Sequence, residues 1–213
     1  MNSFLIKEIA ETLHLQAIDP EERFMTSGVS WQQYETLLDQ LGDSPSYRVA
    51  YLEGELEIMA PSRKHELSKD NIGRLLSAYF EETRTRFYGL GSTTFRQEFK
   101  QRGAELDASY CIGTNKEFPD LAIEVVETSG GIDKLEVYKG LGVLEVWFWQ
   151  RQQFSVYRLR GEQYDMIATS EVLPQMDLTL LAAYVEHPEP LDAVLEYRER
   201  VRAQLRANQI QLE

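Results

Sequence analysis

The stretch "FPDLAIEVVETSGGIDKLEVYKGLGVLEVWFWQ", Phe118 to Gln150, decides the fold of this chain. Its opening run, residues 121–126, is apolar and β-branched after a Pro-Asp pair, a pattern typical of a buried strand. Glu124 interrupts this run, on the strand face that it shares with Ala122 and Val126. A carboxylate among apolar neighbours costs several kcal/mol unless it is paired, hydrogen-bonded or bound to a metal. We therefore expect Glu124 to have a specific partner.

The rest of the stretch predicts a crossover between two strands. Residues 131–142, "GIDKLEVYKGLG", predict a short helix. The next run, "VLEVWFWQ", carries bulky side chains on both faces, as expected of a central strand that is covered on both sides. Strand, helix and strand in this order favour a right-handed parallel crossover. A further hairpin strand, "QFSVYRLR", follows at 153–160.

The elements predicted before this stretch are a helix at 4–15, a helix at 30–42, a hairpin at 47–62, a helix at 65–87 and strands at 93–100 and 105–112. Ser30 caps the second helix and Gly42 ends it. In the hairpin, Glu55 and Glu57 are expected to face solvent, opposite the apolar face. The long helix is expected to bury an apolar stripe that begins at Leu67.

This order of elements predicts an α/β fold of the α+β kind, with a mixed β-sheet flanked by helices. We expect a single domain over 1–213, with an N-terminal helical extension at 1–45, a core at 46–185 and a C-terminal helix at 186–213. The last helix has an apolar stripe, made of Leu191, Val194, Leu195, Val201 and Leu205. It packs either on its own domain or on a second copy of the chain.

Charge and cysteine content exclude several classes of protein. The net charge of −13 opposes non-specific binding to nucleic acid, although residues 63–102 hold nine Lys or Arg against five acids, a net +4. That segment is either a solvated face or a surface that faces phosphate. The single Cys111 rules out an intrachain disulfide, and the histidines lack zinc-site spacing. Without a signal-like leader or a membrane-length apolar run, we expect a cytoplasmic protein with no membrane partner.

Asp107 is the expected partner of Glu124. In "ELDASYCI" it shares a strand face with Ser109 and Cys111, opposite the apolar residues. If the two strands are neighbours, the two carboxylates lie across from each other, within reach of one cation. Such carboxylates repel and raise one pKa unless a metal neutralises them. An all-oxygen site of this kind suits Mg²⁺ or Mn²⁺.

Lys134 stands in the first turn of the helix at 131–142, where a cation opposes the helix dipole. A nearby anion would explain its position, either Glu124 or a phosphate at the helix start. Alternatively, Asp133 complements the dipole and Lys134 is an ordinary surface lysine.

Several blocks of the sequence together are similar to one known family. "LEGELEIMAPSRKHELSKDNIGRLLSAYF", "ELDASY" and the stretch from "PDLAIEVV" to "LEVWFW" resemble the Uma-two-type restriction endonucleases, over roughly Trp31 to Tyr157. That family belongs to the PD-(D/E)XK nuclease superfamily. The resemblance implies a restriction endonuclease-like core in which a mixed sheet lies between helices.

The resemblance also implies the site residues. The superfamily's first acid falls on Asp107 and its second on Glu124, and both would hold the metal. The usual lysine position, two residues after the second acid, holds a valine here. The lysine that matches the family is Lys134, and Lys139 is the alternative. Leu106 stands where the family commonly has a proline, a departure that concerns strand geometry more than chemistry.

Two further residues are secondary candidates. His65 matches a family histidine at the start of the long helix, where a lone histidine caps, hydrogen-bonds or lines a cleft more often than it acts as a general base. Asp120 begins the strand of Glu124, and strict alternation puts it on the same face at the far end unless Pro119 shifts the register.

The residues and the resemblance together predict a Mg²⁺- or Mn²⁺-dependent endonuclease that hydrolyses DNA. Asp107 and Glu124, with the Val125 carbonyl, would hold the cation, while Lys134 would orient or help deprotonate the attacking water and stabilise charge. A non-catalytic nucleic-acid-binding or regulatory module on the same fold is the alternative, and a structural assembly protein is a third. We expect a homodimer with contacts outside residues 63–102, because two symmetric sites cut both strands of a duplex most simply.

Overall fold

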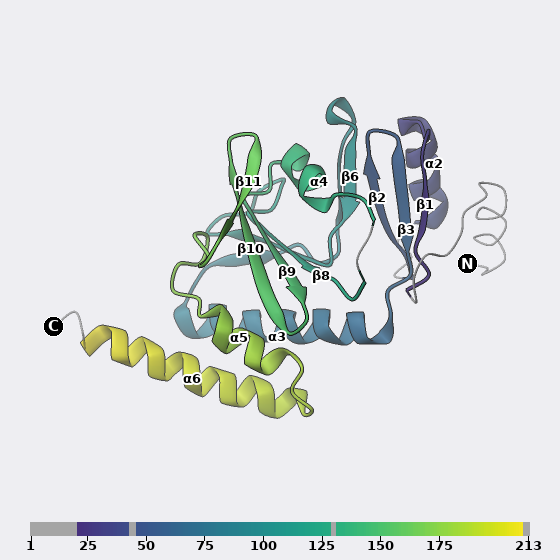
Figure 1. The fold of residues 1–213 in the computed structure, drawn as a ribbon. Coiled ribbons are helices and arrows are strands. Elements are labelled where there is room, and N and C mark those ends of the chain that lie inside the picture. Colours follow the sequence, from purple (N-terminus) through teal and green to yellow (C-terminus); the bar gives the residue numbers. More distant parts are fainter. Residues whose placement is uncertain (1–20, 43–45, 129–130, 211–213) are drawn as a thin grey trace.

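The computed structural model of the chain describes residues 21–42, 46–128 and 131–210 (Figure 1). The helix expected at 4–15 lies outside these residues. Within them, two β-sheets stand side by side and helices cover their faces. None of the helices in the described part of the chain is long and apolar enough to cross a membrane.

Among the described residues, the larger sheet has six strands in the order β11-β10-β9-β8-β7-β4. These strands are Gln163–Ile167 (β11), Gln153–Arg160 (β10), Glu145–Gln150 (β9), Leu121–Val125 (β8), Ala108–Ile112 (β7) and Phe87–Gly89 (β4). β8 and β9 are parallel and the other pairs are antiparallel, which confirms the predicted crossover. β9 lies between β8 and β10 with Trp147 and Trp149 buried, as expected of a central strand.

A second sheet, antiparallel throughout, contains the predicted hairpin. Its described strands have the order β1-β3-β2-β6-β5. They are Phe24–Thr26 (β1), Glu55–Met59 (β3), Arg48–Leu52 (β2), Arg102–Glu105 (β6) and Thr94–Gln97 (β5). The strand expected at 93–100 ends early, because a 3-10 turn, Glu98–Lys100, follows β5.

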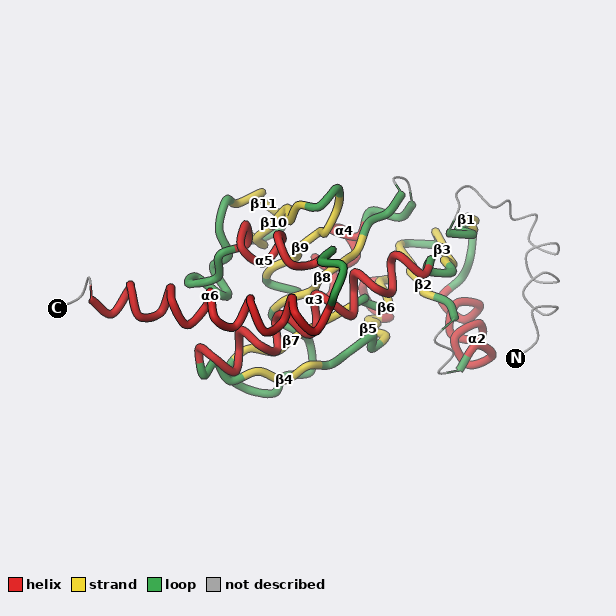
Figure 2. The backbone as a smooth tube through the Cα atoms, turned by 90° about the horizontal axis from the view of Figure 1, so that it is seen from below, coloured by secondary structure: helices red, strands yellow, loops and turns green. Residues whose placement is uncertain are grey.

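Helices cover both faces of the larger sheet. α3 (Arg63–Thr83), α5 (Leu178–Val185) and α6 (Pro190–Ile210) pack on one face, and α4 (Lys134–Leu141) packs on the other (Figure 1, Figure 2). α2 (Trp31–Leu41) packs against the smaller sheet. The larger sheet and its helices therefore have a restriction endonuclease-like order. A helix (α3) precedes three antiparallel strands (β4, β7 and β8), and a second helix (α4) leads to a parallel strand (β9).

The predicted helix boundaries are confirmed for α2 and corrected for α3. Ser30 caps α2 with its side chain, and the backbone N–H of Gly42 closes its last turn. α3 ends at Thr83 because Arg84 takes a left-handed conformation with φ of 56°. Leu67 is 50% exposed, so the expectation that it is buried is wrong. The buried side of α3 extends from His65 to Phe80 and does not include Leu67.

The strand predicted at 105–112 is divided between the two sheets. β6 ends at Glu105 and β7 begins at Ala108, so Leu106 and Asp107 form the link. Leu106 is buried in the core beneath α4, whereas Ala108 packs in the core beneath α3. The chain passes from one core to the other within two residues, and Asp107 stands at this passage.

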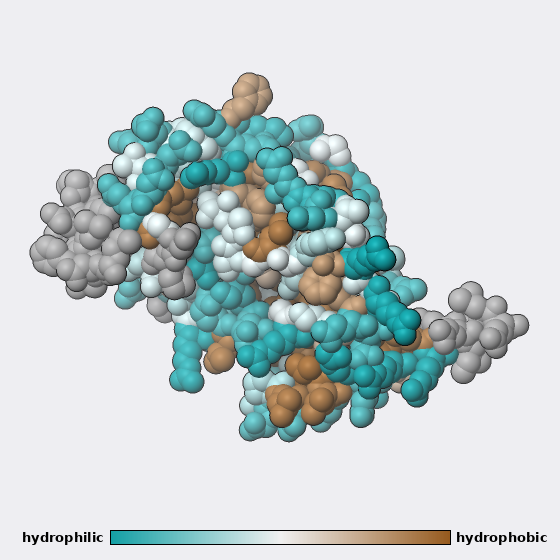
Figure 3. Space-filling model, turned by 180° about the vertical axis from the view of Figure 1, so that it is seen from behind, coloured by the Kyte–Doolittle hydropathy of each residue, from teal (hydrophilic) through white to brown (hydrophobic). Residues whose placement is uncertain are grey.

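The C-terminal helix α6 docks on its own chain. Ala193, Tyr197 and Val201 are buried, and α6 lies alongside α3 in the larger core. Leu191 and Leu195 stay 70% and 53% exposed, and apolar side chains gather over the beginning of α6 at the bottom of Figure 3. One part of the predicted apolar stripe therefore packs on the chain itself, and the other part is exposed to solvent. Self-association stays a prediction.

Candidate active site

Asp107 and Glu124 lie next to each other at the junction of β7 and β8. β7 and β8 pair with Ala108 opposite Ile123, and continuing this register by one residue sets Asp107 opposite Glu124. The backbone N–H of Val125 donates to Asp107 Oδ2 at 2.9 Å, and the backbone N–H of Asp107 points to Glu124 Oε1 at 3.4 Å. Both acids are buried. The expectation that the two acids meet across adjacent strands is confirmed.

Residues on α4 fix the carboxylate of Glu124. The hydroxyl of Tyr138 donates to Oε1, and the ammonium of Lys134 lies 3.8 Å from Oε2. Burial raises the pKa of Glu124 to about 7, against the opposing effect of Lys134 and with a further contribution from Asp107. Tyr138 was not predicted from the sequence, although it follows Lys134 by four residues and so lies on the same face of α4.

Lys134 is the lysine that the structure brings to the acids. Burial acts to lower its pKa, but Glu124, Glu57 and Asp107 outweigh this effect and the pKa is raised. The side chain of Asp133 caps α4 by accepting from the N–H groups of residues 135 and 136. Asp133 therefore caps the helix start, as the second explanation of this turn expected, but Lys134 faces the carboxylates and is not an ordinary surface lysine. Lys139 pairs with Glu136 one turn back on the same helix, at 2.6 Å.

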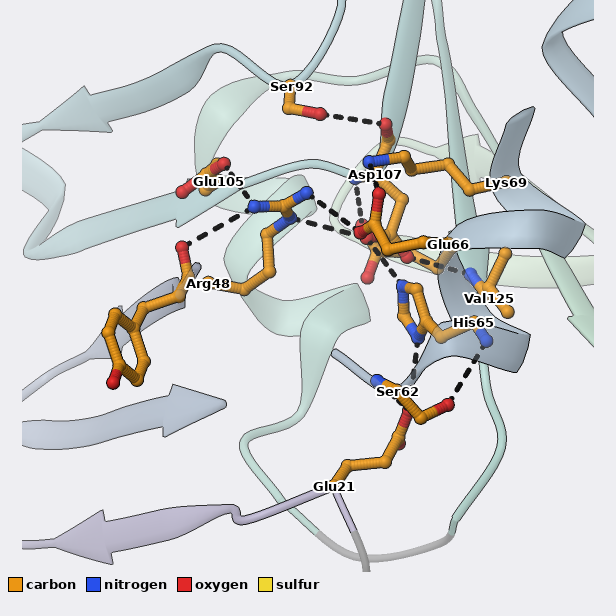
Figure 4. A network of polar contacts seen from close by, with 12 residues as sticks. Glu21, Arg48, Ser62, His65, Glu66, Lys69, Ser92, Glu105, Asp107 and Val125 are labelled. Carbon is orange, nitrogen blue, oxygen red and sulfur yellow. Dashed lines mark hydrogen bonds and ion pairs between the residues drawn. The ribbon is translucent and has the colours of Figure 1, made fainter. Parts of the chain in front are cut away.

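The far side of Asp107 contacts a buried histidine (Figure 4). His65 Nε2 lies 2.9 Å from Asp107 Oδ1, and His65 Nδ1 lies 3.3 Å from Glu21 Oε1. Burial lowers the pKa of His65, but the hydrogen bonds to Asp107 and Glu21 outweigh it and raise the pKa to about 10. The pKa of Asp107 is lowered, because His65 and the Val125 N–H outweigh the effect of burial. His65 therefore hydrogen-bonds Asp107 and pairs with Glu21, and its raised pKa favours the charged imidazolium form.

Arg48 adds a second cation to this network, from β2 (Figure 4). Its Nε lies 3.7 Å from Asp107 Oδ1, and its Nη1 and Nη2 lie 3.0 Å from Glu105 and Glu66 respectively. Burial raises the pKa of Glu105 to about 7, although Arg48 opposes this shift. Arg48 and Glu21 were not predicted from the sequence, because residues so distant along the chain share no spacing pattern.

Glu57 and Arg23 line the same cleft as Glu124 and Lys134. This cleft has a volume of about 400 Å³ and opens between α4, β3 and the end of β8. Glu57 is 3% exposed and accepts the N–H of Ile132 at 2.9 Å, so the expectation that it faces solvent is wrong. The reason is tertiary, because the loop before α4 covers the β3 face that the hairpin alone would leave open.

Asp120 lies apart from the acid pair, at the opposite end of β8. Its carboxylate accepts the N–H of Ile112 at 2.8 Å and pairs with Lys116 at 2.6 Å. These contacts close the connection between β7 and β8. Asp120 therefore supports the hairpin, and the structure does not bring it to Glu124.

The oxygen donors at this junction fit a hard divalent cation. Glu124 lines the 400 Å³ cleft, while Asp107 lines an adjacent hollow of about 760 Å³ beside α3, so the acid pair separates the two spaces. Mg²⁺ takes one or two protein carboxylates and keeps several waters. Each oxygen of Asp107 carries a hydrogen bond, yet a carboxylate oxygen can accept more than one contact. Within the described ranges, no three His, Cys, Asp or Glu side chains form a metal-binding group.

The fold and the junction of two acids with a lysine define a restriction endonuclease-like protein. Residues 31–186 match the Uma2 family, which is described as "Putative restriction endonuclease", and the chain belongs to this family. The match confirms the resemblance seen in the sequence and extends it through β11 and α5. A comparison with curated proteins found no match.

Proposed function

We propose that this protein is a metal-dependent endonuclease that hydrolyses phosphodiester bonds in DNA. One observation carries the proposal: the backbone N–H of Asp107 points to the Glu124 carboxylate, the N–H of Val125 donates to the Asp107 carboxylate, and Lys134 meets Glu124. The two carboxylates, with the Val125 carbonyl, would hold Mg²⁺ or Mn²⁺. The family description supports a nuclease. The PD-(D/E)XK assignment belongs to this proposal.

The residues at the cleft would each have a different role in the hydrolysis. A divalent cation would supply Lewis-acid chemistry to the phosphodiester. Lys134, with its ammonium 3.8 Å from Glu124 Oε2, orients the attacking water and stabilises negative charge on the phosphoryl oxygens. Tyr138 holds the other oxygen of Glu124 and so fixes the direction in which Oε2 points.

His65 and Arg48 act as positioning residues for Asp107. Both contact Oδ1, while Oδ2 accepts the Val125 N–H. Two cations on one oxygen hold the carboxylate ionised and fix its rotation. Glu21 balances the charge of the imidazolium from the other side.

The alternative is a non-catalytic nucleic-acid-binding module on the same fold, and one observation favours it. Asp107 lines the hollow beside α3 and both of its oxygens already contact protein donors. In this alternative the Asp107 network is a buried structural element, and Lys134 binds phosphate without hydrolysis.

The experiment that separates these functions measures cleavage and metal binding together. The purified chain is incubated with supercoiled plasmid in EDTA, Mg²⁺ or Mn²⁺, and Mn²⁺ binding is titrated by calorimetry. We expect metal-dependent nicking that D107N, E124Q and K134A reduce by at least a hundredfold, since removal of a single charge-stabilising group costs 10²–10³. K139A and D120N are the matched controls and should retain cleavage.

Two results would decide against hydrolysis. Duplex binding by the wild type without cleavage in either metal would favour the non-catalytic module. Equal Mn²⁺ affinity in the wild type, D107N and E124Q would remove the metal site itself.

A further inference from the structure

The cleft at Glu124 and Lys134 has a second wall, formed by β9 and β10, which follow β8 in the larger sheet (Figure 1). The described residues of this β9–β10 wall are half-buried and line the cleft with the side chains of Phe148, Gln150, Ser155 and Tyr157. None of these side chains is charged, and the charged residues described in the lining come from other segments of the chain. The cleft therefore has a charged side at the acid and the lysine and an uncharged side on β9 and β10.

The strand register places the β9–β10 wall directly beside the candidate active site. Phe148 of β9 is the Cα partner of Glu124 on β8, and Ser155 of β10 is the Cα partner of Phe148. These three residues form one row across the sheet, and because neighbouring strands lie about 4.8 Å apart, the row extends about 10 Å from the acid. A phosphodiester bound at Glu124 and Lys134 has a nucleoside on each side. The β9–β10 wall lies within reach of the nearer one.

The rings of the wall offer a surface for stacking. Phe148 and Tyr157 pack edge to face, with ring centroids 5.6 Å apart and ring planes at 83°. Met166, the Cα partner of Tyr157 on the edge strand β11, is 64% exposed, so the apolar surface continues to the edge of the sheet. Aromatic side chains beside a phosphate site are the usual platform for the face of a nucleobase.

The polar groups of the wall suit the edge of a base. The Gln150 amide and the Ser155 hydroxyl can both donate and accept hydrogen bonds, which is what the edge of a base requires. In the part of the chain that the structure describes, neither of these groups nor the Tyr157 hydroxyl has a hydrogen-bond partner. They are therefore available to a ligand in the cleft.

We propose that the β9–β10 wall binds an unpaired nucleobase next to the phosphodiester, so that the protein cleaves DNA at unpaired nucleotides in preference to intact duplex. In a duplex the faces of a base are covered by its neighbours and its pairing edge is occupied, so a base that enters such a cleft must first leave the stack. This inference rests on the proposed function, because the same cleft must receive a phosphodiester. It deepens that function by naming the class of DNA that is cut.

The test compares the wild type with Y157L, Y157F and Y88L. Y157L removes the ring and keeps apolar volume, whereas Y157F removes only the hydroxyl. Tyr88 is 45% exposed on the edge strand β4 and does not line the cleft, so Y88L is a matched control for the loss of an exposed tyrosine.

The fluorescein-labelled DNA probes are a single strand, the same strand with abasic sites in place of its central bases, a perfect duplex and a duplex with a central unpaired loop. Anisotropy in Ca²⁺ over a salt series measures affinity, and a gel shows that each probe stays intact. Cleavage of all four probes is then measured in Mg²⁺ and in Mn²⁺. Calorimetry with Mn²⁺ alone measures the metal affinity of each variant.

We expect the wild type to bind the single strand at least about tenfold more tightly than the duplex, because unpairing a base costs a few kcal/mol. Y157L should bind the single strand at least about fivefold more weakly, the lower end of what one stacked base contributes. It should equal the wild type on the abasic strand, because the ring and the base are partners in one contact. Salt slope and Mn²⁺ affinity should not change, because Tyr157 supplies no charge. Y157F and Y88L should match the wild type, and the looped duplex should be cut at its loop.

Equal affinity of Y157L and the wild type for the single strand would overturn the inference, and so would equal rates of cleavage in the looped and the perfect duplex. Metal-dependent cleavage by the wild type would keep the proposed function in either case. If Y157L does not fold by circular dichroism, the wild type decides, and equal affinity for the strand with and without its central bases would overturn the inference. If the wild type cleaves none of the probes in Mg²⁺ or Mn²⁺, the proposed function fails and the preference for unpaired nucleotides fails with it.

Discussion

The hydroxyl of Tyr138 donates a hydrogen bond to Oε1 of Glu124, the oxygen that also faces the backbone N–H of Asp107. The other oxygen, Oε2, faces Lys134 at 3.8 Å. Residues 134 and 138 are one helical turn apart on α4, so one helix face holds both oxygens of this carboxylate. The orientation of Glu124 therefore depends on α4 as much as on β8.

We predict that Y138F weakens metal binding without unfolding the protein. The variant keeps the ring but leaves Oε1 without its strongest donor, and loss of such an outer contact lowers metal affinity by about 10–100-fold. The free energy of unfolding should fall by about 1–3 kcal/mol. Mn²⁺ calorimetry and urea unfolding check both values. Y164F is the control, since Tyr164 donates a hydrogen bond to Val143 O outside the acid pair; a tenfold loss of Mn²⁺ affinity there would contradict the interpretation.

We predict that His65 makes stability depend on pH. The folded pKa of about 10 lies above the ordinary value of 6.5, so the contribution of the imidazolium is complete below pH 6.5 and is lost as pH rises toward 10. Urea unfolding in EDTA across this range should show decreasing stability in the wild type. H65Q should be less stable by about 3–5 kcal/mol near neutral pH, because Glu21 and Asp107 lose their shared cation.

H187Q serves as the control for that measurement, because His187 is half-buried, stacks on Tyr184 and hydrogen-bonds only the backbone of Glu189 among the described residues. It should follow the wild-type pH profile. An unchanged slope in H65Q would show that the imidazolium does not link the two acids in solution.

We predict that G131A disturbs the cleft more than it disturbs the chain elsewhere. A Cβ at Gly131 would lie 2.2 Å from Glu57 Oε2, in a backbone conformation that favours glycine. Gly161 also has a positive φ, of 61°, but has open space around it, so G161A should cost only about 1–2 kcal/mol of backbone strain. Thermal unfolding should show the larger loss in G131A, and Mn²⁺ affinity should fall in G131A alone. Equal effects in both variants would exclude a special role for this close approach.

We predict a two-fold dimer that uses the exposed beginning of α6. Light scattering at micromolar concentration should give a mass of about twice 24.7 kDa. L191E combined with L195E should reduce it to the monomer mass, because both side chains are exposed on the docked helix. A mass near 24.7 kDa for the wild type, independent of concentration, would leave paired cutting of both strands by a fixed dimer without support.

The sequence by itself determined the local elements and the acid pair. The alternation around Glu124, the glycine that ends α4 and the tryptophans of β9 depend on residues close together in the chain, so periodicity and capping reveal them. Asp107 followed from the same alternation, because two strands with one polar face each can satisfy their acids by pairing. The match to family blocks then selected Lys134 over Lys139.

Only the tertiary structure decided which other side chains complete the site. Glu57 has the alternation of a solvent-facing residue, and it is buried because the loop before α4 covers its face of β3. His65 and Arg48 come from distant elements and meet Asp107 only because the chain passes between the two sheets at that residue, and Glu21 joins them through His65. Side-chain periodicity reports the faces of single elements, whereas contacts between elements depend on how the two cores pack, and no spacing in the sequence encodes that packing.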